Sequence, residues 1–178
     1  MLATALFLHV VSAIGIFATL AVEWILLDRV RAAPTRAAEQ EAARAFSVLP
    51  RIGAPSTALV LVTGLYLTAA EGVWSQGWPV LSIAGLVIIG VTGAVFGSSR
   101  PMASLARGGR PPDGRPPTNG LRKPLWARVA IALGIVALMT FQPGVAGSAE
   151  ILCATVVLGA ARMLWPSGKP SKTTNGTP

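Results

Sequence analysis

The sequence predicts an all-α membrane protein, a transmembrane helical bundle of five spans. Two observations predict it: the composition is strongly apolar, and the basic residues are confined to alternate connections between long apolar runs. Of the 178 residues, 52% are hydrophobic and 12% are charged, and the mean hydropathy is +0.61. A soluble domain of this length rarely has such a composition.

Each apolar run is long enough to cross a bilayer, because a hydrocarbon core of about 30 Å needs roughly 20 helical residues. The fifth run contains Glu150 and Arg162, so four spans are the alternative. The runs form one predicted membrane domain, residues 1–165, followed by a polar tail, 166–178, that we expect to be disordered. The predicted spans cover residues 2–27, 52–71, 79–97, 125–142 and 145–165.

The orientation follows from the lysines and arginines, which mark the cytoplasmic side of bacterial membrane proteins. They occur in the first connection, the third connection and the C-terminal tail, and the second and fourth connections have none. Five spans with the N-terminus outside and the C-terminus cytoplasmic place all of them inside, whereas four spans would export Lys169 and Lys172. We therefore predict a multi-pass protein of the bacterial inner membrane.

The connections also have distinct predicted structures. The first, 35–49, is rich in alanine and alternating charges and favours a short helix. The third, 98–124, contains a proline-rich basic stretch and predicts a mobile cytoplasmic loop near the lipid surface. Because the basic residues are separated by long apolar runs, we expect the bilayer and its anionic headgroups as partners, and no nucleic acid. Other membrane subunits are further candidate partners.

Polar residues inside the spans predict which helix faces point inward, because lipid offers them no hydrogen-bond partner. In the first span, His9, Ser12, Thr19 and Glu23 share one helical face, with Gly15 at its edge. A second stripe runs along the second span, so we expect the two to face each other. It consists of Thr57, Gly64, Thr68 and Glu71.

In the third span, Gly93 and Gly97 have the small-xxx-small spacing that permits close helix packing. With Gly90, they predict packing inside the monomer, and self-association is the alternative.

The assigned orientation places several soft or polar donors near the outer surface. His9, Met139 and Cys153 are candidate metal ligands suited to Cu(I), and His9 is a candidate haem ligand. The alternative is a polar pocket without a cofactor, in which the histidine only makes a hydrogen bond. That pocket would comprise Ser12, Glu23, Thr68, Glu71, Gln142 and Glu150.

Three segments resemble helices of small bacterial membrane proteins related to the copper-resistance CopD type: LHVVSAIG (Leu8–Gly15), TGLYL (Thr63–Leu67) and MTFQPG (Met139–Gly144). The resemblance implies a histidine at the outer end of the first helix, matched by His9, and a threonine-glycine pair in the second. It also implies a lysine before the proline of the fourth helix, where this chain has Gln142.

The sequence contains no GxxxxGK[ST], GxSxG or HExxH motif, so nothing in it indicates nucleotide binding or hydrolysis. We expect a non-enzymatic membrane protein, a subunit or accessory factor of a larger complex. The first alternative is a haem or copper protein of the CopD-like type. The second is a small proton-coupled carrier that would use His9, Glu23 and the threonines of the second span.

Overall fold

The computed structural model describes residues 1–109 and 118–164, and every regular element within them is helical, which confirms the all-α class. The predicted tail, 166–178, and the proline-rich part of the third connection lie outside the described residues. The elements are α1 (Leu2–Ala32), α2 (Arg36–Ala45), η1 (Phe46–Val48), α3 (Leu49–Glu71), η2 (Val73–Gln76), α4 (Trp78–Phe96), α5 (Ser99–Ala106), α6 (Thr118–Phe141) and α7 (Val145–Leu164).

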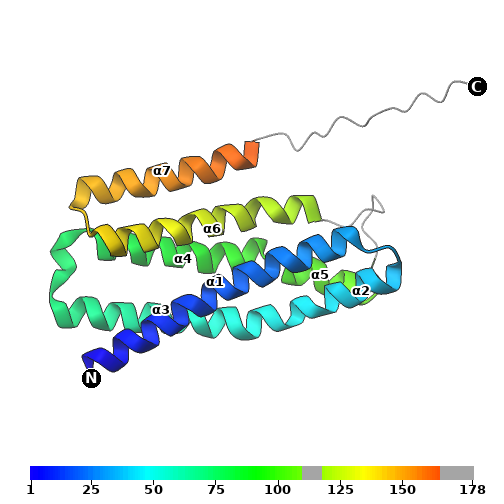
Figure 1. Ribbon diagram of the computed structural model, residues 1–178, viewed down its shortest axis with the longest axis horizontal. Helices are drawn as coiled ribbons and strands as arrows, with labels where there is room; N and C mark the ends of the chain where they lie inside the picture. The colour runs from blue at the N-terminus through cyan, green and yellow to red at the C-terminus, as the bar shows by residue number, and fades with distance from the viewer. Residues whose placement is uncertain (110–117, 165–178) are drawn as a thin grey trace, which may run out of the picture.

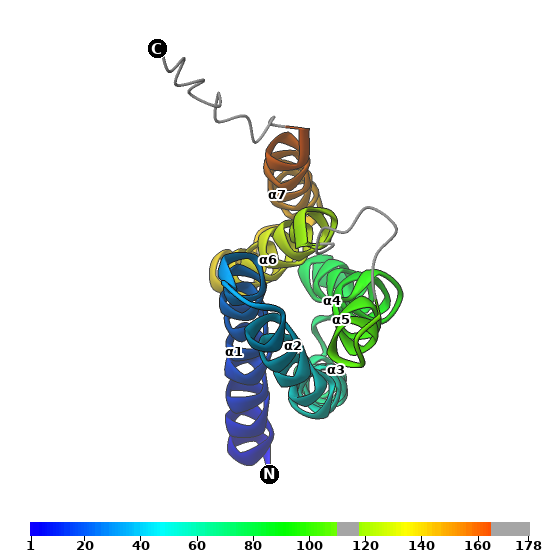
Figure 2. The ribbon, with the colours of Figure 1, turned by 90° about the vertical axis from the view of Figure 1, so that its right-hand side faces the viewer.

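The five long helices, α1, α3, α4, α6 and α7, run in alternating directions, so that successive connections lie at opposite ends of the bundle (Figure 1). One end, which we call the N-terminal end, holds Met1, η2 and the turn between α6 and α7. The other, the basic end, holds α2, η1, α5 and the start of α6. Seen along the bundle, α1, α3, α4 and α6 surround the interior, and α7 lies outside them against α6 (Figure 2).

Length and composition support four membrane crossings among the described residues. The helical stretches that qualify are Leu2–Ala32, Arg36–Glu71, Trp78–Ala106 and Gly120–Phe141. Large apolar side chains such as Phe7, Ile14 and Leu133 are exposed around the outside of these helices. An apolar exterior of this kind is typical of a protein surrounded by lipid.

Local sequence explains where the helices begin and end. The Thr35 hydroxyl accepts a hydrogen bond of 3.3 Å from the Ala38 N–H and caps α2. Pro50 and Pro79 lie in the first turns of α3 and α4, where a missing N–H leaves no bond unmade. Gly72 ends α3 in the left-handed conformation, with a φ of 67°, which a residue without Cβ adopts readily.

The most tightly packed part of the interior is at the basic end. Leu27 of α1, Phe46 of η1, Met102 of α5 and Leu125 of α6 are all almost fully buried there. The short helices between the long ones therefore close this end with apolar side chains.

The prediction that residues 98–124 form a loop is wrong for the two parts of this connection that are helical. Residues Ser99–Ala106 form α5, because Met102 and Leu105, three positions apart, share one face and are both buried. The next helix also begins earlier than predicted, at Thr118.

The Lys and Arg side chains that the structure describes lie at the basic end, except for Arg128, which is farther along α6 in the interior. They come from the end of α1, from α2, α5 and the starts of α3 and α6. Of the acidic residues described, Glu71 and Glu150 lie at the N-terminal end, and the other four lie in the half of the bundle that holds the basic end, where the basic residues outnumber them: Glu23, Asp28, Glu39 and Glu41. The bundle is therefore strongly asymmetric in charge along its axis.

Candidate functional site

Two cavities lie one above the other inside the bundle, each between α1, α3, α4 and α6. The His9 cavity, toward the N-terminal end, has a volume of about 480 Å³. The Glu23 cavity, toward the basic end, has a volume of about 500 Å³. The Leu61 side chain lines both, so it forms part of the wall between them.

In the His9 cavity, the imidazole is held against α3. His9 is 8% exposed, and its Nδ1 lies 3.0 Å from the Thr63 hydroxyl oxygen. Because that hydroxyl donates its proton to the Leu59 carbonyl at 2.6 Å, it accepts a hydrogen bond from Nδ1–H. In the neutral imidazole, Nε2 is then the unprotonated nitrogen and is able to accept a hydrogen bond or bind a metal.

Gly64 makes the close approach of His9 to α3 possible. A Cβ at this position would lie 3.2 Å from the His9 Cε1. The threonine-glycine pair, Thr63 and Gly64, therefore supplies both a hydrogen-bond acceptor and the space for the ring.

Ser82 of α4 contributes a second polar group to the same cavity. It is 4% exposed, and its hydroxyl has no hydrogen-bond partner among residues 1–109 and 118–164. A buried hydroxyl without a partner is unfavourable by about 1–3 kcal/mol. No feature of the sequence distinguished this serine from others in the spans.

Three of the predicted pocket residues line the His9 cavity with the histidine: Thr68 and Glu71 from α3, and Gln142 after the end of α6. Met139 of α6, a predicted metal ligand, lines it as well. Ser12 is buried, but its hydroxyl donates to the Leu8 carbonyl of its own helix at 2.6 Å. Gln142 adopts a φ of 44°, and the chain turns there toward Pro143.

The structure does not bring Cys153 or Glu150 to His9. Both are exposed on α7, which packs against α6 and α4. Within the part of the chain that the structure describes, no three His, Cys, Asp or Glu side chains are grouped as a metal site would require. Of the three predicted metal ligands, His9 and Met139 line the same cavity.

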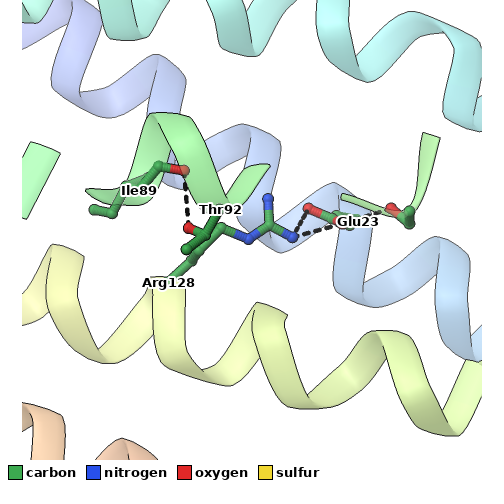
Figure 3. A network of polar contacts seen from close by, with 5 residues as sticks. Glu23, Ile89, Thr92 and Arg128 are labelled. Atoms are coloured by element: carbon green, nitrogen blue, oxygen red, sulfur yellow. Dashed lines mark hydrogen bonds and ion pairs between the residues drawn. The ribbon is translucent and has the colours of Figure 1, made fainter. Parts of the chain in front are cut away.

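Glu23, which the sequence grouped with His9, lies instead in the other cavity and forms a buried ion pair with Arg128 (Figure 3). Arg128 Nη2 lies 2.8 Å from Oε1 and 2.9 Å from Oε2 of the carboxylate. The Ser98 hydroxyl donates to Oε1 as well. The two side chains are 5% and 9% exposed, so α1 and α6 are joined by a pair that has little access to solvent.

Arg128 also has an unused donor. Its Nε–H is buried and has no hydrogen-bond partner among the residues described. The predicted packing glycines lie beside it: Gly90, Gly93 and Gly97 all line the Glu23 cavity. A Cβ at Gly93 would lie 3.5 Å from Arg128 Nη1, so this glycine faces the guanidinium of α6.

Comparison with protein-family models, with curated proteins and with solved structures finds no match to this chain. The geometry of the two cavities is therefore the basis for assigning a function.

The pairing of Glu23 with Arg128 was not predicted, although the sequence contains a signal for it. Ionisable residues inside membrane helices usually pair with one another. Glu23 lies near the end of the first apolar run and Arg128 near the start of the fourth, so antiparallel helices place them at the same depth.

Proposed function

We propose that the chain is a multi-pass inner-membrane protein with five crossings, its N-terminus outside and its C-terminus in the cytoplasm. The charge asymmetry of the bundle supports this orientation, because basic residues favour the cytoplasmic side. The fifth crossing is supported by α7, whose 20 residues have a length of about 30 Å, and which runs beside α6 (Figure 1). Anionic headgroups of the inner leaflet are then the partners of the basic end.

We further propose that the protein acts as a non-enzymatic subunit or accessory factor of a membrane complex, with the His9 cavity as its ligand pocket. The observation that carries this proposal is the cavity itself. Its volume of about 480 Å³ is within the range of small-molecule sites, and its wall is largely apolar. His9 Nε2 supplies an acceptor to orient a ligand.

A haem or copper protein of the CopD-like type is the second candidate. In its favour, the imidazole of His9 and the thioether of Met139 line the same cavity. Both groups suit Cu(I), and a histidine-methionine pair is also a known form of haem ligation. The hydrogen bond from Nδ1 to Thr63 would fix the imidazole with Nε2 available to the metal.

Gentle extraction from the native membrane distinguishes the two candidates. For the subunit proposal, we expect a colourless, metal-free preparation that keeps a partner protein in fixed stoichiometry. A Soret band, or one copper per chain, that is lost in His9→Ala and kept in Cys153→Ser would replace it with the haem or copper candidate. Cys153→Ser is the matched control because Cys153 is exposed on α7.

A further inference from the structure

The Glu23 cavity opens between α3 and α4 toward the surface that faces lipid. Ala54 and Ala58 of α3 and Ala94 of α4 line it and are exposed. Gly90, Gly93 and Gly97 of α4 leave its wall free of side chains. A lipid-soluble molecule could therefore enter from the bilayer without passing through either end of the bundle.

The charges inside the cavity select against an ionic ligand. Glu23 and Arg128 neutralise each other at 2.8 Å, and both are buried. A further charge would be buried without a partner of opposite sign, which is strongly unfavourable in an apolar environment. The ligand that fits is therefore neutral.

The guanidinium of Arg128 selects for a hydrogen-bond acceptor. Arg128 is 7% exposed, lines the cavity and uses Nη2 for the ion pair. Its Nη1 lies toward Gly93 of the cavity wall and makes no hydrogen bond within the described residues, whereas Nε is enclosed by protein. Guanidinium nitrogens only donate, so the matching group on a ligand is an oxygen with a free lone pair. A hydrogen bond to a charged donor is stronger than one between neutral groups.

We propose that the Glu23 cavity binds a neutral, lipid-soluble molecule through a carbonyl oxygen that accepts a hydrogen bond from the Arg128 guanidinium. Acyl esters and alkyl quinones both carry this group. The volume of about 500 Å³ suits a small molecule. A helix of another protein, with a diameter of 10–12 Å including side chains, is too wide to be the occupant. This site is separate from the His9 cavity and does not depend on the function proposed for it.

The test is a competition experiment on the full-length protein in detergent, with radiolabelled methyl palmitate as the bound probe. The competitors are unlabelled methyl palmitate, a decyl-substituted benzoquinone, palmitate and hexadecane. We expect at least one of the two carbonyl compounds to compete about tenfold more strongly than hexadecane, which lacks an acceptor. The better of the two identifies the ligand class. Equal competition by hexadecane, or strongest competition by ionised palmitate, would overturn the proposal.

Two leucine substitutions on α4 locate the probe. A Cβ at Gly90 would lie 3.7 Å from the Thr57 Cγ2, an ordinary contact, and Gly90 lines the cavity, so we expect the side chain of Gly90→Leu to fill part of it. Gly90→Leu should lower the affinity for the probe at least tenfold. Ala84 is exposed and lines neither cavity, so Ala84→Leu should leave the affinity unchanged. Thermal unfolding confirms that both variants are folded.

His9→Ala separates this site from the one proposed above. It should leave probe binding unchanged. If His9→Ala abolishes binding while Gly90→Leu preserves it, the probe occupies the His9 cavity. That result would refute a site in the Glu23 cavity and leave the function proposed for the His9 cavity intact.

Discussion

Arg128→Met is expected to lower the free energy of unfolding by about 3–5 kcal/mol, the usual effect of removing one partner from a buried ion pair. The substitution leaves the Glu23 carboxylate buried, with the Ser98 hydroxyl as its one remaining partner among the described residues. Methionine is similar to the aliphatic part of arginine, so the effect comes from the lost charge and not from a large cavity.

The double variant Glu23→Gln with Arg128→Met should recover most of this loss, because no unpaired charge is then buried. Arg100→Met is the control, since Arg100 is exposed on α5, and it should change stability by less than about 0.5 kcal/mol. The measurement is thermal or denaturant unfolding in detergent. A double variant as unstable as Arg128→Met alone would show that the charge of Glu23 is not the cause.

Gly134→Ala is expected to destabilise the packing of α7 on α6 by about 1–3 kcal/mol, as overpacking of a filled interface usually does. A Cβ at Gly134 would lie 2.7 Å from the Oγ1 and 3.1 Å from the Cγ2 of Thr155 on α7. Because both γ atoms of this β-branched residue point at the glycine, rotation of its side chain cannot relieve both contacts.

Two variants isolate this effect in the same unfolding assay. Gly120→Ala, also in α6, has nothing within 4 Å of the new methyl group and should stabilise by up to about 1 kcal/mol through helix propensity. Adding Thr155→Ala to Gly134→Ala should restore most of the lost stability. If Gly134→Ala behaves like Gly120→Ala, α7 does not pack on α6 as the structure has it.

The inward face of α1 could be predicted from sequence because it depends on the spacing of polar residues along one helix. His9, Ser12 and Glu23 share that face, and all three are buried. On α3 the same reasoning was less successful, since Glu71 of the predicted stripe is exposed and the buried Thr63 was outside it. Threonines can bond to their own helix carbonyls, so their spacing constrains helix orientation only weakly.

The contents of each cavity could not be predicted, because they depend on which helices are neighbours. Glu23 and Arg128 are 105 positions apart, and the antiparallel packing of α1 and α6 brings them together. The predicted ligand Cys153 is separated from His9 for the same reason, since α7 lies outside the four central helices (Figure 2). The short helix α5 was missed because two buried side chains, Met102 and Leu105, are too few to give a clear pattern.

Cysteine labelling of intact and permeabilised cells tests the proposed membrane topology most directly. In a Cys153→Ser background, the single substitutions Ser75→Cys in η2, Ser104→Cys in α5 and Lys172→Cys in the tail are treated with a membrane-impermeant maleimide. We predict that Ser75→Cys reacts in intact cells and that the other two react only after permeabilisation. Reaction of Ser104→Cys and Lys172→Cys from opposite sides of the membrane would contradict five crossings with a cytoplasmic basic end.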